Sequence, residues 1–175
     1  MVLAGGVGAA KLLRGLVRLV PLRNLVIVGN IGDDFEVQGL HVSADLDIVM
    51  YTLAGIVDEQ KGWGIANDSF NCLEMLGRLG FETWFKLGDR DIATHIVRTK
   101  LLGEGKSLSE ATAELCRRLG LNAILVPFSN DPVRTKMVSG SKILEFQDYF
   151  VKRGTKDDVA NVVFKGAENA KPAPG

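Results

Sequence analysis

The chain has 175 residues, enough for one domain of ordinary size, and 46% of them are hydrophobic, as in globular proteins. Basic and acidic residues both number 21, so the formal net charge is zero, which removes the electrostatic case for binding nucleic acid or an anionic membrane surface. The sequence shows no apolar run of about 18 residues, no secretory leader and no paired cysteine motif. We therefore expect a cytoplasmic protein without disulfides or structural zinc.

The first predicted element is a short buried strand over residues 2–4, which runs directly into Gly5, Gly6 and Gly8. Apolar residues then recur at helical spacing, so a helix follows the glycines, with Lys11 on its first turn. Between a strand and a helix, unpaired backbone N–H groups and the helix dipole favour an anion. The pattern therefore predicts an anion-binding glycine loop.

This glycine loop matches neither of two familiar phosphate loops. A dinucleotide fingerprint from Gly6 would need a third glycine where Lys11 stands, and an acidic residue where Asn30 follows the second strand. A Walker loop needs glycine before the lysine and serine or threonine after it, whereas Ala10 and Leu12 stand there. Two interpretations remain: an unclassified anion cradle, or glycines that only allow tight packing of strand against helix.

A second buried strand is predicted over residues 25–28 and completes a right-handed parallel βαβ unit. Asn30 and the adjacent carboxylates of Asp33 and Asp34 follow it, and in open α/β sheets such loops form the ligand crevice. The two carboxylates could hold a divalent cation beside the phosphate site. The alternative is a solvated turn.

The next helix is predicted to begin at a cap formed by Ser43 or Asp45. Asp45 and Asp47 would point about 200° apart in a regular helix, so one serves as the cap and Asp47 is free for a ligand. A further helix is predicted to be capped by Asp68 or Ser69.

Charged residues gather where the following helix begins, at Asp89 and Arg90. Within this helix, polar side chains form one stripe opposite the apolar residues Ile92 and Ile96, which we expect to face inward. The stripe consists of Asp91, His95 and Arg98. It indicates either a ligand site or a solvated face with local ion pairs.

Ser107 and Glu110 form a capping box for a last helix, and a third strand is predicted over residues 123–126. Short β segments around a short helix are expected over residues 137–164. Three strands are few for a doubly wound sheet, and the last ten residues contain no closing element. We therefore expect one Rossmann-like α/β domain over residues 1–175, with a parallel sheet flanked by helices, as the amino-terminal portion of a longer polypeptide.

Six motifs follow one another along nearly the whole chain. They are AGGVGAAKLLRGL, NIGDD, GLHVSADLDIVMYTLAG, WGIANDSF, WFKLGDRDIATHIVRT and VPFSNDPVRTKM. Together they closely resemble the 2-phospho-L-lactate transferase (CofD-like) family, whose members are considerably longer. One departure is that the family's double acid before Pro132 is Asn130 and Asp131 here.

The resemblance implies a step in the biosynthesis of coenzyme F-420. In that step a phospholactyl or phosphoenolpyruvyl group passes from a guanosine diphosphate-linked donor to 8-hydroxy-5-deazariboflavin, and GMP is released with the help of Mg²⁺. The family's two deazaflavin-contacting positions fall on Asp47 and Lys86. Displacement at phosphorus requires mainly positioning and charge neutralisation, and Asp47 could orient the attacking hydroxyl or take its proton.

The resulting site prediction assigns the acceptor to Asp47, the candidate catalytic residue, and to Lys86, and assigns the cation to Asp33 and Asp34. Further substrate contacts are predicted at Gly5, Gly6, Gly8, Lys11, Asn30, Asp89, Arg90 and His95. The alternative function is a nucleotide-sugar-binding regulator resembling gluconeogenesis factors, without catalysis. We also expect the isolated chain to expose apolar surface and to aggregate or form a homodimer.

Overall fold

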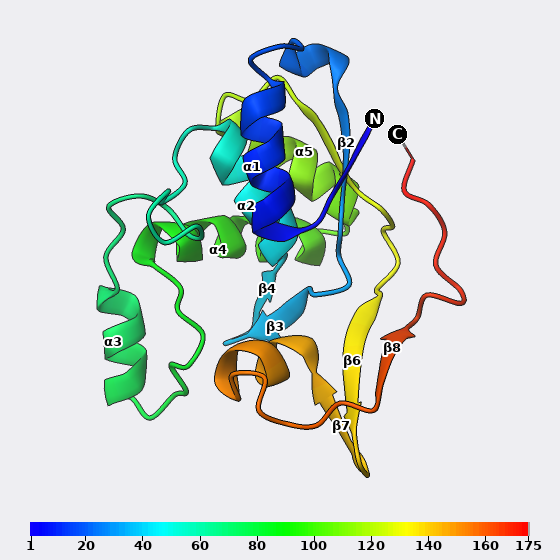
Figure 1. Cartoon of the computed structure of the whole chain (residues 1–175). Coiled ribbons are helices and arrows are strands. Elements are labelled where there is room, and N and C mark those ends of the chain that lie inside the picture. The colour runs from blue at the N-terminus through cyan, green and yellow to red at the C-terminus, as the bar shows by residue number, and fades with distance from the viewer. Residues whose placement is uncertain (175) are drawn as a thin grey trace.

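A three-stranded parallel sheet forms the centre of the computed structural model, which describes residues 1–174 (Figure 1). Its strands are β1 (Val2–Ala4), β2 (Val26–Gly29) and β5 (Ile124–Pro127), in the order β1-β2-β5. Helix α1 (Gly6–Leu16) connects β1 to β2. The predicted α/β class, the βαβ unit and the three parallel strands are therefore confirmed.

Four further helices lie in sequence between β2 and β5. They are α2 (Ala44–Leu53), α3 (Asn71–Arg78), α4 (Asp89–Gly103) and α5 (Leu108–Arg118). One hydrophobic core joins the sheet to three helices through Leu13 of α1, Leu46 of α2 and Leu115 of α5. The predicted capping box of Ser107 and Glu110 begins α5. No helix within residues 1–174 is long and apolar enough to cross a membrane.

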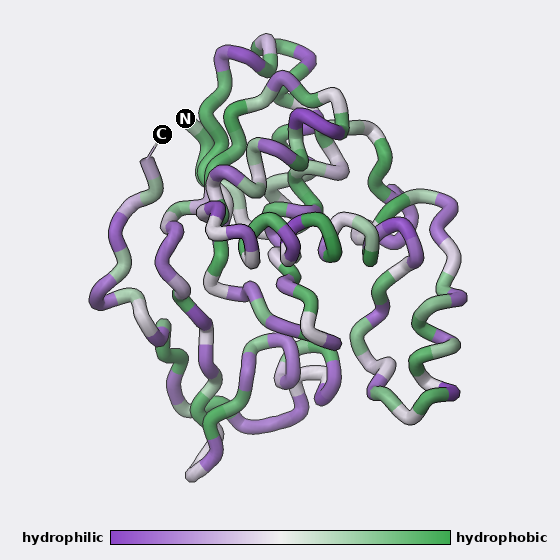
Figure 2. The backbone as a smooth tube through the Cα atoms, turned by 180° about the vertical axis from the view of Figure 1, so that it is seen from behind, coloured by the Kyte–Doolittle hydropathy of each residue, from purple (hydrophilic) through white to green (hydrophobic). Residues whose placement is uncertain are grey.

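The strand order explains why these helices cover one face of the sheet. From β1 to β2 to β5 the chain moves in one direction across the sheet, and right-handed crossovers then place α1, α2 and α5, which pack on it, on the same side. The opposite side, which we call the bare sheet face, consists of Leu3, Val26, Val28, Ile124 and Val126. Leu3 is 78% exposed and Ile124 is 45% exposed. Figure 2 shows that the strands beside the N-terminus are predominantly hydrophobic.

The remaining strands form two small antiparallel sheets. They are a hairpin of β3 (Phe35–Val37) and β4 (Leu40–Val42), and a sheet in which β6 (Arg134–Ser139) lies between β7 (Lys142–Glu145) and β8 (Asn161–Lys165). Two short helical turns are η1 (Leu22–Asn24) and η2 (Asp148–Lys152). The β6 sheet and η2 confirm the short β segments and short helix predicted for this part of the chain.

Helices α3 and α4 exchange their caps. The Asp89 carboxylate accepts hydrogen bonds from the backbone N–H groups of Asn71, at 3.2 Å, and Cys72, at 2.9 Å, at the start of α3. In return, the Asp68 carboxylate accepts from the second and third residues of α4. The predicted local cap of α3 by Asp68 or Ser69 is therefore wrong. Gly88 permits the arrangement, because a Cβ atom there would lie 2.2 Å from Asp68 Oδ2.

Candidate active site

The glycine loop and the acidic loop meet at one edge of the parallel sheet, because the carboxyl ends of parallel strands lie together. Asn30, which follows β2, donates its backbone N–H to the carbonyl oxygen of Ala4 at 2.9 Å. Phe128, which follows β5, donates to Gly29 at 2.9 Å. A cavity of about 290 Å³ lies here, lined by Gly5, Asn30, Phe128 and neighbouring strand residues.

The glycine loop approaches a carboxylate of the protein itself. Helix α1 begins at Gly6, which has a φ of +64°, and its N-cap residue, Gly5, has no side chain to cap the first turn. A Cβ atom on Gly6 would lie 3.3 Å from Asp45 Oδ1, whereas Gly8 has no neighbour within 4 Å. Lys11 is exposed on α1. Gly6 thus allows close packing against Asp45, and the N–H groups beyond it remain available to an anion.

Three aspartates cluster beside this loop. The side-chain amide of Asn30 donates to Asp45 Oδ2 at 2.9 Å and to Asp33 Oδ2 at 3.3 Å. Burial, together with the charges of Asp33 and Asp34, raises the pKa of Asp45 to about 6. Burial also raises the pKa of Asp33. Negative charge is therefore concentrated beside the glycine loop, where a cation or protons could neutralise it.

The Asp34 side chain points away from the Asn30 amide that Asp33 and Asp45 face. Its carboxylate is buried and accepts a hydrogen bond from Ser43 Oγ at 2.8 Å, and its Oδ2 lies 3.1 Å from His41 Nε2. The alternative of a solvated turn is wrong for this residue. Within residues 1–174, no three histidine, cysteine or acidic side chains are arranged as a metal site. Asp33 and Asp45 lie near each other, because the Asn30 amide N–H group donates to both carboxylates.

A second cavity brings Asp47 and Lys86 together. It measures about 70 Å³ and is lined in addition by Tyr51, Asp91 and His95 among its polar residues. This volume holds a few water molecules or a hydroxyl group, not a ring system. Lys86 also borders an open hollow of about 630 Å³, which contains Phe70, Leu73 and Thr83.

Asp47 is paired, not free as predicted. Arg98 Nη1 donates to Asp47 Oδ2 at 3.1 Å, and Arg98 Nη2 donates to Asp47 Oδ1. Arg98 is completely buried. Burial, the largest single influence, lowers its pKa, but the charge and hydrogen bonds of Asp47 together with smaller contributions outweigh it, so the pKa of Arg98 is raised. The two aspartates of α2 do point in different directions, but Ser43, not Asp45, is the N-cap residue, and its hydroxyl is committed to Asp34.

The polar stripe of α4 faces the protein interior. Asp91, His95 and Arg98 are buried, whereas Ile96 is 51% exposed. Both the solvated-face interpretation and the inward position of Ile96 are therefore wrong, whereas Ile92 is buried as predicted. The physical reason is that α4 presents Arg98 to the buried carboxylate of Asp47, and this leaves Ile96 on the solvent side.

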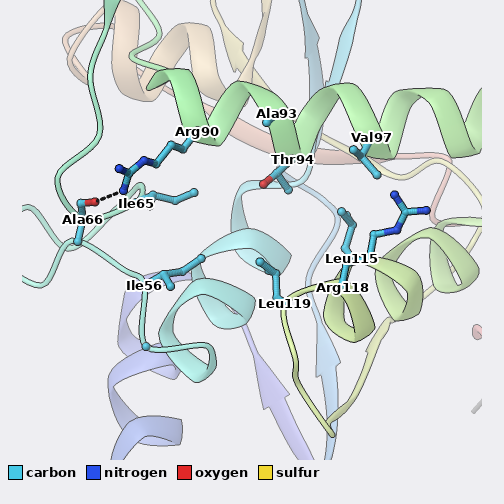
Figure 3. Close-up of a pocket in the computed structure, with 11 residues that line it drawn as sticks. Ile56, Ile65, Ala66, Arg90, Ala93, Thr94, Val97, Leu115, Arg118 and Leu119 are labelled. Carbon is cyan, nitrogen blue, oxygen red and sulfur yellow. Dashed lines mark hydrogen bonds between the residues drawn. The ribbon is translucent and has the colours of Figure 1, made fainter.

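Asp89 and Arg90 lie away from the Asp47 cavity. The Asp89 carboxylate is engaged at the start of α3, where the backbone N–H of Cys72 is the main cause that lowers its pKa to about 2. Arg90 donates to the carbonyl oxygen of Ala66 at 3.4 Å and lines a separate apolar cavity of about 540 Å³ beside Ile56 and Ile65 (Figure 3). Their predicted role as substrate contacts remains a prediction, and the structure gives Asp89 a capping role.

Sequence reasoning missed several residues of the site. The sequence pattern predicts a capping role for Asp45 and places Arg98 only in a polar stripe. Tyr51 follows Asp47 by one helical turn, and this i, i+4 spacing could have indicated it. Thr135 had no sequence signal: it comes from β6 and packs on Gly32, where a Cβ atom would lie 2.8 Å from its hydroxyl oxygen.

Comparison with known proteins identifies relatives of this chain. A phosphoenolpyruvate transferase of Streptomyces avermitilis is 47% identical over 180 residues, an alignment that covers 100% of this chain and 56% of the relative. A 2-phospho-L-lactate transferase of Methanosarcina acetivorans is 42% identical over 173 residues, which cover 99% of this chain and 56% of the relative. The chain thus spans a little over half the length of these relatives.

A solved structure is similar in fold. A UPF0052 family member from Bacillus halodurans superposes with a TM-score of 0.59 at 16% identity, over 98% of this chain and 52% of that protein. Residues 1–175 match the family model described as 2-phospho-L-lactate transferase CofD. The chain therefore belongs to the 2-phospho-L-lactate transferase CofD family.

Proposed function

We propose that the protein transfers a phospholactyl or phosphoenolpyruvyl group from a guanosine diphosphate-linked donor to 8-hydroxy-5-deazariboflavin and releases GMP, as a step in coenzyme F-420 biosynthesis. The observation that carries this proposal is the shared cavity of Asp47 and Lys86, the two positions that match the family's deazaflavin contacts. Its relatives are named for the transfer of either three-carbon acid, so both donors enter the test.

The donor is proposed to bind at the glycine loop. The N-cap residue of α1, Gly5, has no side chain, so the N–H groups that follow Gly6 can hydrogen-bond a diphosphate, and Lys11 adds positive charge to the same helix. The cavity of about 290 Å³ beside Gly5 and Asn30 lies at the carboxyl ends of the strands, where nucleotides bind in sheets of this type.

The acceptor is proposed to bind around Lys86. The open hollow next to Lys86 has room for a tricyclic ring, and Phe70 offers an aromatic face there. The smaller cavity that Lys86 also lines can receive a hydroxyl group next to Asp47. Because Arg98 already occupies both carboxylate oxygens, we assign Asp47 to orienting that hydroxyl through its remaining lone pairs.

Asp33 and Asp45 would hold Mg²⁺ in this proposal. A bound Mg²⁺ neutralises phosphate charge during displacement at phosphorus. Asn30 sets the spacing of the two carboxylates through its bridging amide. The predicted ligand Asp34 would then act indirectly, through its charge on Asp45.

The test is a transfer assay on the protein in its full natural length, with each donor in turn. Asp47→Asn is expected to lower kcat by about a hundredfold, the scale of acid–base and orienting help, with little change in the donor KM. Lys86→Ala should mainly raise the acceptor KM. Lys100→Ala, an exposed lysine of α4, is the matched control.

Fluorescence titration with the deazaflavin separates this function from the nucleotide-sugar-binding regulator. A saturable change that Lys86→Ala weakens is expected for the transferase. No change with the deazaflavin, together with tight binding of a nucleotide-sugar, would establish the regulator instead.

A further inference from the structure

The buried face between α2 and α4 contains more charge than the acceptor contacts require. Arg98 and His95 are 0% and 1% exposed, and Asp47 and Asp91 are also buried. Burying ionisable groups is costly unless each one finds a partner. The hydrogen-bond partners of these four buried residues therefore indicate the role of each one.

The contacts determine where the proton of His95 resides. His95 Nδ1 lies 3.2 Å from Arg98 Nη1, and a guanidinium can only donate, so Nδ1 must accept. The nearest Asp47 oxygen is 3.7 Å from Nδ1, too far for a hydrogen bond. A neutral His95 therefore carries its proton on Nε2, which lies 3.2 Å from Asp91 Oδ1.

Tyr51 completes the network from α2. Its hydroxyl donates to the same Asp91 oxygen at 2.7 Å. Asp91 thus accepts a hydrogen bond from Tyr51 and lies near His95 Nε2, while Arg98 donates to both His95 and Asp47. His95 Nε2 and Arg98 Nε have no well-aligned acceptor among the described residues. His95 lines the cavity of about 70 Å³, so a hydroxyl or water held there could supply the missing acceptor for Nε2.

We propose that Arg98 is the positioning residue of Asp47, and that His95, held as its Nε2–H tautomer by the hydrogen bond that Arg98 donates to its Nδ1, positions Arg98. The two-point contact with the planar guanidinium fixes the plane of the Asp47 carboxylate where it borders the cavity. The hydrogen-bond directions in this network are inferred from the structure alone, whereas the effect of the network on transfer rests on the proposed function.

Nitrogen-15 NMR shows which ring nitrogen of His95 carries the proton, and so tests the hydrogen-bond directions without any transfer assay. The chain contains two histidines, and His41→Gln identifies the signals of His95 by elimination. At about pH 8 the neutral Nε2–H tautomer is expected for His95, and Arg98→Met should remove the preference for it. An Nδ1–H tautomer in the unchanged protein would overturn the proposal.

A double-mutant cycle on the full-length protein tests the effect on transfer. Arg98→Lys keeps the charge but loses the planar fork, so kcat should fall by about a hundredfold, as expected when a reacting group is misplaced. If Arg98 acts through Asp47, Arg98→Lys combined with Asp47→Asn should be no slower than Asp47→Asn alone. Multiplied effects, or unchanged kcat in Arg98→Lys, would refute the positioning role.

Conservative changes and controls separate positioning from mere support of the fold. His95→Gln can accept from Arg98 and donate to Asp91, so it should recover most of the kcat that His95→Leu loses. The donor KM should stay constant throughout. Arg117→Lys alters an exposed arginine that also pairs with a carboxylate, and should leave kcat unchanged. If the unchanged protein transfers neither group, the proposed function is wrong. The His95 tautomer then still tests the hydrogen-bond network independently.

Discussion

Two aspartates of one helix serve different sites because α2 points them in different directions. Asp45 lies against the glycine loop and Asn30, whereas Asp47 lies against Arg98 of α4. Helix α2 therefore links the proposed donor end of the site to the proposed acceptor end. At the scale of single residues, the electrostatics of these two carboxylates differ in sign: Asp45 faces further negative charge, and Asp47 faces a cation.

The first prediction concerns Asp45 and Mg²⁺. Folding raises the pKa of Asp45 from 3.8 to about 6, so the stability that its proton contributes is present below pH 3.8 and lost as pH rises through about 6. A cation at Asp33 and Asp45 would replace that proton. We therefore expect Mg²⁺ to raise Tm by a few degrees at about pH 7.5 and to have little effect at about pH 5.

The change in Tm is measured by thermal unfolding with and without Mg²⁺ at the two pH values. Asp45→Asn should abolish the Mg²⁺ effect, and Asp158→Asn, on an exposed loop, should leave it intact. An equal effect of Mg²⁺ at both pH values would mean that Asp45 is not a ligand.

The second prediction concerns the stability of the Asp47–Arg98 pair. Removing one partner leaves a buried charge uncompensated, so Arg98→Met should lower the free energy of unfolding by about 3 kcal/mol or more. Replacing both partners, as Asp47→Leu with Arg98→Met, should cost clearly less, because no unpaired charge remains. Urea unfolding measures both values, with exposed Arg117→Met as the control. A double variant less stable than Arg98→Met would contradict this account.

At the scale of elements, the packing of α3 against α4 depends on reciprocal caps. Neither helix is capped by the residue that precedes it; each is capped by an aspartate beside the other helix. The pKa of Asp89 is lowered to about 2, so its contribution to stability is present above 3.8 and is lost as pH falls through about 2. The two helices should therefore lose stability together in strong acid.

Gly88→Ala is the third prediction. The new Cβ atom would collide with the Asp68 carboxylate and break the cap of α4, so Tm should fall. Gly103→Ala in the same helix meets no neighbour within 4 Å and should stabilise by roughly 0.5–1 kcal/mol, the usual gain over glycine. In an Asp68→Ala background Gly88→Ala should cost much less, since the colliding group is gone. Equal costs in the two backgrounds would show that the strain lies elsewhere.

At the scale of the whole molecule, the unbalanced sheet is the dominant feature. Parallel sheets are normally covered on both faces, yet within residues 1–174 the helices α1, α2 and α5 share one core on one side. The aliphatic residues of the bare sheet face are left in contact with water. This supports the sequence-based expectation of exposed apolar surface.

The fourth prediction is that the 175-residue chain associates with itself through the bare sheet face. Sedimentation velocity should show a concentration-dependent increase in mass, and Leu3→Glu with Ile124→Glu should shift the chain toward the monomer. Because Leu3 and Ile124 are exposed, Tm should change little. Leu19→Glu places the same charge on a residue that is 83% exposed elsewhere, and should not affect association. If it dissociates the chain equally, the bare sheet face is not the interface.

Patterns among neighbouring residues in the sequence determined the strands, the loops and one helix cap of this protein. The three parallel strands were predicted to within a residue or two, because strands inside such a sheet are continuous aliphatic runs bounded by glycine or proline. The glycine loop, the acidic loop and the capping box of α5 were likewise visible, because each is formed by neighbours in sequence. The family motifs added Asp47 and Lys86, which periodicity alone could not have paired.

Only the tertiary structure decided how charges are paired between distant segments. The stripe of α4 has the periodicity of a solvated face, and nothing near Arg98 in sequence reveals that its partner is Asp47 on α2. The exchange of caps between Asp68 and Asp89, and the pKa of Asp45, depend in the same way on contacts between separate elements. Helical spacing shows which residues share a face, but the direction of that face depends on the charges and apolar surfaces packed against it.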